Sequence, residues 1–243
     1  MKTLGLVLFL AACGGGTSHP GGNADSAVQS DSRVFMDAPP NVPAMITLSG
    51  TATDSSQNST TPLAGVAVSL KDRASDAVLA TATSDAQGKY SLMVTTNGHV
   101  VDAYILATKS GYVDAMAFPG KPFEADDTKA DSNLITTSNY NLLGVYTQQQ
   151  ASNGIIVVEV LDASGAAVKG AAAKCTPMSG SILYSGDNGI PASGMSTNTD
   201  GTAFLVNVPP GAAALDVTMS GASFKNHSVI ARANTFTSTV VTE

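Results

Sequence analysis

The sequence has no tryptophan and is poor in charge, histidine and cysteine: of its 243 residues 13% are charged, three are histidine and two are cysteine. Its 12 basic residues are outnumbered by 19 acidic ones, and the sequence pI is about 4.7. Such a chain offers no positive field to hold a polyanion, so we expect no nucleic-acid partner. Low charge with many small and β-branched residues favours strands and turns, which predicts an all-β protein.

The sequence also lacks an apolar run long enough to cross a bilayer, which takes about 20 residues. The run at residues 4–10 (LGLVLFL) is shorter, follows Lys2 and precedes Ala11 and Ala12, a pattern typical of a signal peptide. Residues 10–13 (LAAC) resemble the lipobox of bacterial lipoproteins. That resemblance implies a signal peptide at residues 1–12 and a mature chain that begins at Cys13, with diacylglycerol and acyl chains such as palmitate on that cysteine.

Two or three acyl chains on one cysteine anchor a protein stably, whereas one chain binds only reversibly. Gly14 follows Cys13 at the position where Asp favours inner-membrane retention in enterobacterial lipoproteins, so the resemblance implies the outer membrane rather than the inner one. Two alternatives stay open: a soluble protein in which Cys13 occurs by chance, and a disulfide between Cys13 and Cys175.

The segment at residues 13–42 is dominated by Gly, Ser, Asp, Asn and Pro and has no apolar periodicity. A segment of this composition cannot bury enough apolar surface to offset the entropy of ordering. We expect a flexible linker whose end-to-end distance, about 30 Å, would hold a folded domain clear of the lipid headgroups.

The rest of the sequence contains a divergent internal repeat. In the first copy, residues 62–70 (PLAGVAVSL) are followed by residues 83–92 (TSDAQGKYSL); in the second, residues 167–175 (AVKGAAAKC) are followed by residues 198–205 (NTDGTAFL). Short strands separated by turns at regular spacing are typical of antiparallel sandwiches. We therefore expect two tandem antiparallel, Ig-like β-sandwich domains, at residues 43–148 and 152–243.

Side-chain alternation within the repeats predicts which residues are buried. In each copy one strand has three side chains on one face by the period-two rule; these are Val66, Val68 and Leu70 in the first copy and Ala171, Ala173 and Cys175 in the second. Cys175 is then a packed and inert thiol rather than a redox or metal-binding one. The aromatic residue after each turn, Tyr90 or Phe204, is expected to fill the space between two sheets.

The repeated order of a Gly-x-x-Val-x-Leu strand, a Thr-Ser-Asp-x-x-Gly-x-Tyr turn and a later Ser-Gly resembles the carboxypeptidase regulatory-like family. The resemblance covers residues 45–113 and, less closely, residues 154–230. It implies a transthyretin-like (prealbumin-like) sandwich. It also implies an accessory structural or binding module, since members of this family mostly accompany other domains.

No catalytic motif is present. The three histidines, His19, His99 and His227, are widely separated, and the sequence has neither HExxH nor a Gly-x-Ser-x-Gly elbow. We expect no enzyme activity and no cofactor beyond the lipid. A hydrolase would require His99 or His227 in a pocket beside a serine or a carboxylate.

Two segments are candidates for ligand binding. The acidic stretch at residues 124–131 groups carboxylates that could bind Ca²⁺, although a solvated loop is the simpler interpretation; its acids are Glu124, Asp126, Asp127 and Asp131. The insertion at residues 176–197 could be a contact loop for a glycan or a protein, through Tyr184, Asp187 and Asn188.

Together these observations predict a non-catalytic lipoprotein of the cell envelope. Its β-sandwich modules would serve as a structural, assembly or recognition element, and its partner would be another envelope protein or a polysaccharide. The alternative is a surface protein that binds a glycan or calcium through the loop at residues 176–197 or the acidic stretch at residues 124–131.

Overall fold

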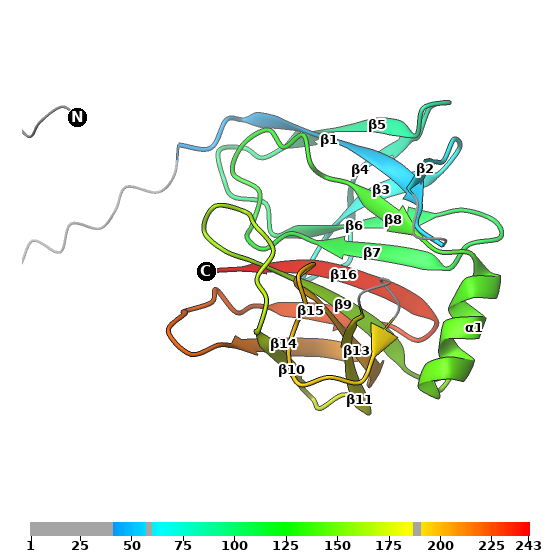
Figure 1. Cartoon of the computed structure of the whole chain (residues 1–243). Helices are drawn as coiled ribbons and strands as arrows, with labels where there is room; N and C mark the ends of the chain where they lie inside the picture. Colours follow the sequence, from blue (N-terminus) through cyan, green and yellow to red (C-terminus); the bar gives the residue numbers. More distant parts are fainter. Residues whose placement is uncertain (1–40, 57–59, 187–190) are drawn as a thin grey trace, which may run out of the picture. The chain divides into compact units, whose positions relative to one another are not determined.

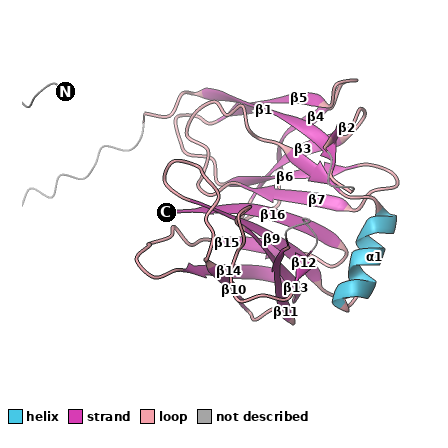
Figure 2. Cartoon of the chain, in the orientation of Figure 1, coloured by secondary structure: helices cyan, strands magenta, loops and turns pink. Residues whose placement is uncertain are grey.

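The computed structural model describes residues 41–56, 60–186 and 191–243, which form sixteen strands and one α-helix (Figures 1 and 2). The expectation of an all-β fold is confirmed. The helix, α1 (Thr137–Thr147), joins what we call the first half (residues 41–148) to the second half (residues 152–243). The predicted signal peptide, Cys13 and almost all of the predicted linker lie outside the described residues.

A nine-stranded sheet runs through both halves in the order β12-β11-β13-β9-β16-β7-β6-β3-β4. Its first-half strands are β3 (Ala67–Asp72), β4 (Val78–Thr83), β6 (Ala103–Thr108) and β7 (Asp114–Phe118). Its second-half strands are β9 (Gly154–Leu161), β11 (Ser181–Ser185), β12 (Pro191–Ala192), β13 (Thr202–Val208) and β16 (Thr235–Thr242).

Two smaller sheets complete the fold. The first half contributes β1 (Met45–Asp54), β2 (Thr61–Pro62), β5 (Lys89–Thr95) and β8 (Ser132–Leu134), in which β8 runs parallel to β1. The second half contributes β10 (Ala172–Thr176), β14 (Gly211–Thr218) and β15 (Ser228–Ala231).

The strand β16 joins the two halves. It lies between β7 and β9 and is parallel to both, with Ser238 opposite Ala117 on one side and opposite Val157 on the other. Its alternating sequence, TFTSTVVT, buries every second side chain, as expected of a strand with one face against the core. The described residues of both halves fall in one compact unit. The predicted division into domains at residues 43–148 and 152–243 stays a prediction.

The predicted core positions are confirmed. Val66, Val68 and Leu70 are at most 1% exposed, and their second-half counterparts Ala171, Ala173 and Cys175 are also buried. Burial raises the pKa of the Cys175 thiol, which agrees with a packing role for a free cysteine.

The core of the second half has alanines at several buried positions and is completed by the first half. Ala171, Ala173 and Ala203 pack in one cluster with three larger side chains of the first half, namely Tyr104, Met116 and Phe118. The rings of Tyr104 and Phe118 stack with centroids 4.7 Å apart. The core of the second half thus combines its own Ile156, Tyr184 and Leu205 with large side chains of the first half.

In both copies of the repeat, a buried hydroxyl hydrogen-bonds to two backbone groups of the preceding segment. Ser84 Oγ accepts a hydrogen bond from Val66 N and donates one to Leu63 O, at 2.9 and 2.6 Å. Thr197 Oγ1 does the same in the second half, where it accepts from Ala171 N at 3.0 Å and donates to Val168 O at 2.6 Å. Each hydroxyl satisfies two backbone groups that would otherwise be buried without partners.

These equivalences correct the prediction for Phe204. Because Ser84 corresponds to Thr197 and Gly88 to Gly201, the residue two positions after the glycine is Tyr90 in the first half but Ala203 in the second. Tyr90 is buried as predicted, and so is Ala203. Phe204 is one position further along the strand, so it lies on the opposite face and is only partly buried.

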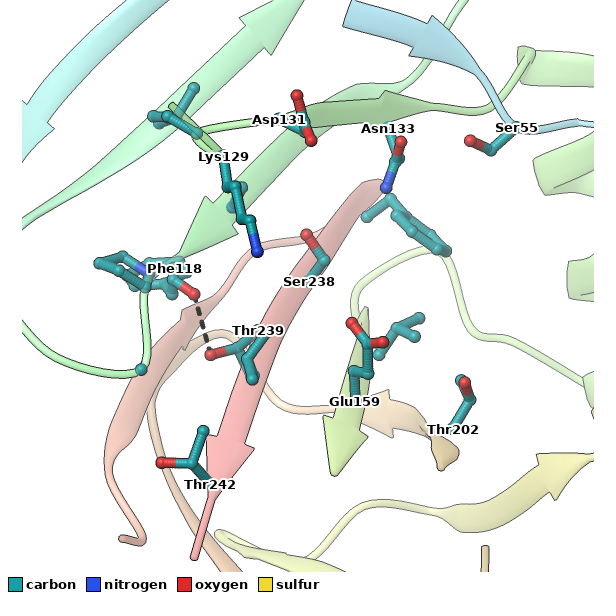
Figure 3. Close-up of a pocket in the computed structure, with 18 of the residues that line it drawn as sticks. Ser55, Phe118, Lys129, Asp131, Asn133, Glu159, Thr202, Ser238, Thr239 and Thr242 are labelled. Atoms are coloured by element: carbon teal, nitrogen blue, oxygen red, sulfur yellow. Dashed lines mark hydrogen bonds between the residues drawn. The ribbon is translucent and has the colours of Figure 1, made fainter. Parts of the chain in front are cut away.

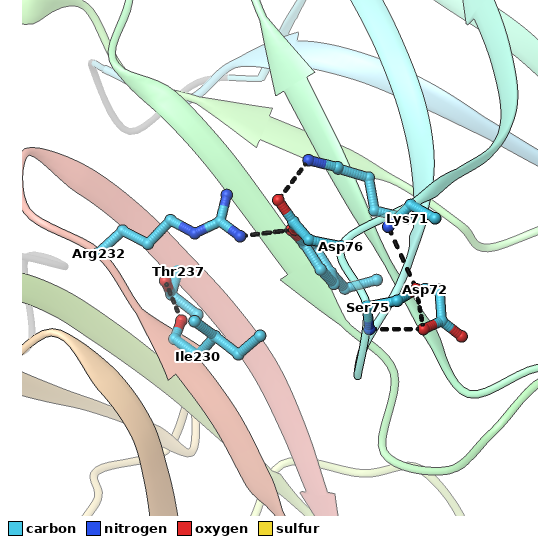
Figure 4. A network of polar contacts seen from close by, with 9 residues as sticks. Lys71, Asp72, Ser75, Asp76, Ile230, Arg232 and Thr237 are labelled. Atoms are coloured by element: carbon cyan, nitrogen blue, oxygen red, sulfur yellow. Dashed lines mark hydrogen bonds and ion pairs between the residues drawn. The ribbon is translucent and has the colours of Figure 1, made fainter.

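A polar network ties the halves together beside β16 (Figure 4). Asp76 accepts hydrogen bonds from Lys71 Nζ and Arg232 Nη2, both at 2.7 Å, and from the hydroxyl of Tyr104. We call these four residues the inter-half network. Nearby, Arg73 Nη1 donates to Ser228 O at 2.7 Å, which is a second link between the halves.

We predict that Gly88→Ala and Gly201→Ala each lower the free energy of unfolding by about 3 kcal/mol. A Cβ at either position would lie 2.5 Å from a backbone oxygen, of Ala52 or of Val160, and both glycines have positive φ. The matched control is Gly165→Ala, which has φ of 83° but no atom within 4 Å of the added Cβ. That variant should lose only about 1 kcal/mol in urea denaturation, and equal losses in all three variants would contradict the prediction.

We also predict that Asp76→Asn lowers the free energy of unfolding by about 1 kcal/mol at pH 7, since the site is partly exposed. Hydrogen bonds from Lys71, Tyr104 and Arg232 hold the pKa of Asp76 well below its ordinary value. The carboxylate therefore stabilises the fold above about pH 4, and this contribution is lost as the pH falls below that value. Urea titrations should show the variant and the wild type converging in acid, whereas Asp114→Asn, on an exposed residue of β7, should match the wild type throughout.

Candidate functional site

A groove of about 1600 Å³ lies over one face of the nine-stranded sheet (Figure 3). Its floor is formed by β7, β16, β9 and β13, so both halves contribute to it. Its walls are the segment at residues 119–131 and helix α1. The groove exists because the opposite face of these strands packs into the core while this face is left without a covering sheet.

The strand register places the floor side chains in rows. Ala117, Ser238, Val157 and Phe204 are paired in turn across β7, β16, β9 and β13. The next row is Val240, Glu159 and Thr202. The floor is therefore largely apolar, with hydroxyl groups and a single carboxylate, that of Glu159.

Helix α1 provides an uncharged wall. The helix begins at the N-cap Thr136, whose Oγ1 accepts a hydrogen bond from Asn139 N at 3.2 Å, and ends at Gln148 in the left-handed conformation. Its sequence TSNYNLLGVYT has no charged residue, and Leu142 and Tyr146 line the groove with 68% and 62% of their surface exposed. Exposed apolar side chains beside a groove are typical of a binding surface.

Two side chains of opposite charge extend into the groove, Lys129 from the wall and Glu159 from the floor (Figure 3). Desolvation, with a smaller contribution from the charge of Asp200, raises the pKa of Glu159. No ion pair or side-chain hydrogen bond forms at Glu159 within residues 41–56, 60–186 and 191–243. The side chain is nevertheless exposed, so the carboxylate keeps contact with water and has no partner in these residues.

The predicted acidic stretch lies along the edge of β1 opposite β5, where both its backbone and its carboxylates hydrogen-bond to the strand. Asp126 Oδ1 accepts from Thr47 N and Asp131 Oδ1 from Thr51 N, both at 2.7 Å. Asp127 accepts from Lys129 N at 2.8 Å. The backbone and the carboxylates of this stretch together take the place of a neighbouring strand and protect the edge of the sheet from further pairing.

The fourth acidic residue of this stretch, Glu124, pairs with Lys121 at 3.4 Å. In the described part of the chain no three His, Cys, Asp or Glu side chains are grouped as a metal site would require. Calcium binding at residues 124–131 stays a prediction.

The predicted contact loop at residues 176–197 is described in part. Tyr184 lies in β11, is 6% exposed and packs in the core, and its hydroxyl accepts a hydrogen bond from Ala173 N at 3.2 Å. Asp187 and Asn188 lie outside the described residues. Tyr184 therefore has a structural position, and binding by this loop stays a prediction.

The described histidines occupy different environments. His99 is exposed. His227 is half-buried, and its Nε2 is 2.8 Å from Thr239 Oγ1, which in turn donates to Phe118 O at 3.0 Å. With the Thr239 proton on a carbonyl, His227 donates to this hydroxyl rather than abstracting its proton. Burial lowers the pKa of His227. The hydrogen bond between His227 and Thr239 has a structural role.

Sequence reasoning singled out one part of the groove lining, the acidic stretch at residues 124–131, and missed the floor and the helix wall. One signal was available: Glu159 interrupts an otherwise apolar strand, GIIVVEVL. A single acid in such a run indicates one face that is not covered by the core. Phe236, Ser238 and Tyr146 gave no comparable signal, because their placement depends on how β16 and α1 pack.

Comparison with known proteins finds no matching family model and no matching curated protein. Among solved structures, the shaft pilin SpaA from Lactobacillus rhamnosus GG aligns at 12% identity and a TM-score of 0.29, over 82% of this chain and 97% of the pilin. The minor pilin GBS52 from Streptococcus agalactiae aligns at 12% identity and 0.28, over 82% and 96%. The Bacillus anthracis TIE protein aligns at 13% identity and 0.27, over 82% of this chain but only 34% of its own.

Similarity at this level assigns no role to the chain, and the resemblance to the carboxypeptidase regulatory-like family stays a prediction. In the described residues, no helix combines the length and the apolar character needed to cross a membrane.

We predict that Asp131→Ala lowers the free energy of unfolding by about 1 kcal/mol, because Thr51 N loses its acceptor. Asp131→Asn keeps an oxygen at that position and should lose less than half as much. Millimolar calcium should leave the Tm of the wild type unchanged in differential scanning fluorimetry. A calcium-dependent rise in Tm that Asp131→Asn abolishes would instead establish the predicted calcium site.

Proposed function

We propose that this protein is a non-catalytic lipoprotein of the cell envelope, anchored through Cys13, that presents residues 41–243 to another macromolecule as a recognition or assembly element. The single observation that carries the recognition role is the groove over the shared sheet, with its uncovered apolar floor and exposed helix wall. Surfaces of this kind are unusual in proteins without a partner.

The way in which the halves are joined supports a presenting role. The strand β16 of the second half hydrogen-bonds to β7 of the first half and to β9 of its own half. In addition, Arg232 of the second half pairs with Asp76 of the first at 2.7 Å. A groove whose floor comes from one continuous sheet keeps its shape when the protein is free, which reduces the entropy lost on binding.

The non-catalytic part of the proposal is supported by the chemistry of the groove. Its carboxylate Glu159 lies on the floor among Val240 and Thr202, and its lining includes neither histidine nor cysteine. In the described residues no side chain is hydrogen-bonded to Glu159, so the pairing of a nucleophile with an adjacent base is not seen there.

The anchor can be tested by intact mass and membrane fractionation of the protein expressed in a bacterium. The wild type should begin at Cys13, carry a diacyl or triacyl mass and sediment with membranes, with the outer-membrane fraction favoured over the inner one. Cys13→Ala should lose the lipid mass and the membrane association, because the thioether is the only attachment that the proposal invokes.

The matched control is Cys175→Ala, which removes the other cysteine and should leave the lipid mass and the fractionation unchanged. Cys175 is buried in the second half, so its thiol is not offered for acylation. An unmodified wild-type chain that retains Met1 and stays in the soluble fraction would refute the lipoprotein proposal.

A further inference from the structure

The groove contains charges that the protein itself leaves unpaired. Among its lining carboxylates in the described residues, only Glu159 has neither an ion pair nor a hydrogen bond; Glu124 pairs with Lys121, and the three aspartates accept backbone N–H groups. Lys129 extends from the wall toward the same space and has no side-chain partner in the part of the chain that the structure describes (Figure 3).

The size of the groove favours a polymer over a small molecule. Its volume, about 1600 Å³, exceeds the range of about 300–1000 Å³ that is usual for small-ligand pockets. The floor extends over four paired strands. Along each strand, side chains that face the groove alternate with side chains that face the core. A surface of this volume, spread over four strands, suits an extended chain that contacts it at several points.

The chemistry of the surface favours a polypeptide over a neutral glycan. An extended peptide places every second side chain on one face, about 7 Å apart, so that apolar groups can lie on Phe204 and Phe236 while charged groups reach the groove's own charges. A neutral sugar chain offers hydroxyl hydrogen bonds to Glu159 and Lys129 but no opposite charge, and charge-assisted pairs are the stronger ones. Peptide residues of both signs would pair with them.

We infer that the groove binds an extended polypeptide segment in which a basic and an acidic side chain, set among apolar residues, pair with Glu159 and Lys129. The inference rests on the proposed recognition function and names the class of its partner. The apolar contacts come from Phe204 and Phe236 on the floor and Tyr146 on the wall.

The probe is a set of fluorescent dodecapeptides of Ser, Thr and Val, blocked at both ends, that carry one Lys and one Glu two, four or six residues apart. Binding to the purified full-length Cys13→Ala chain is measured by fluorescence anisotropy. At least one spacing should bind. Glu159→Gln should weaken that peptide about fivefold, and the same variant should make no difference once the peptide's Lys is replaced by Gln.

Lys129→Gln should likewise weaken binding of that peptide about fivefold. It should make no difference once the peptide's Glu is replaced by Gln. The matched controls are Asp114→Asn and Lys89→Gln, which change exposed charges outside the groove and should leave the affinity unchanged. Each pair of protein and peptide substitutions forms a double-mutant cycle, which separates a direct ion pair from a general effect of net charge.

The inference is overturned if no peptide of the set binds, or if Glu159→Gln weakens all peptides equally, including those without Lys. Binding of chitohexaose that Phe204→Ala abolishes, in the absence of peptide binding, would make the groove a glycan site and would also overturn it. Failure here is distinguishable from failure of the proposed anchor, because the peptides are tested on a purified chain without lipid and the anchor is tested by mass and fractionation.

Discussion

The pairing of β16 with both β7 and β9 is the constraint on which the rest of the structure depends. Without this strand the two halves would share no backbone hydrogen bonds across the sheet, and the nine-stranded sheet would divide between β7 and β9. Its buried face, which includes Thr237 and Val241, contributes to the layer beneath, while Phe236 and Ser238 form part of the groove floor. One strand therefore supplies the link, part of the core and part of the site.

The same strand explains why the second half tolerates alanines at several buried positions. Ala171, Ala173 and Ala203 leave space that three residues of the first half occupy, because β16 brings β7 and β6 against the second half. Tyr104 is the clearest case: it is fully buried, stacks on Phe118 and bonds to Asp76 through its hydroxyl. A ring of this size contributes roughly 2–3 kcal/mol through burial, which small residues in the second half could not provide.

Local patterns in the sequence were sufficient for the strands and for most of the core. Period-two alternation placed Val66, Val68, Leu70 and Cys175 correctly, since alternation depends only on neighbours along the chain. It failed at Phe204, because the repeat was aligned on Asp85 and Asp200 rather than on the hydroxyls of Ser84 and Thr197, and a shift of one residue reverses the face. The acids at residues 124–131 suggested a metal ligand set; their pairing with the edge of β1 involves partners about 80 residues away in the sequence.

The groove could not be predicted because it results from parallel pairing between segments far apart in the sequence. Parallel strands are not joined by a short turn, so nothing local to residues 235–242 indicates that Ser238 will lie opposite both Ala117 and Val157. The sequence shows Glu159 as the one acidic residue in an apolar strand. Its position in a groove could not be predicted, because that depends on which face of the sheet the core leaves uncovered. Glu159 is exposed on that face, so its carboxylate stays partly hydrated in the free protein. Because no side chain of the described residues pairs with it, the carboxylate is available to a cation that arrives with a partner, and pairing there costs less desolvation than it would in the core.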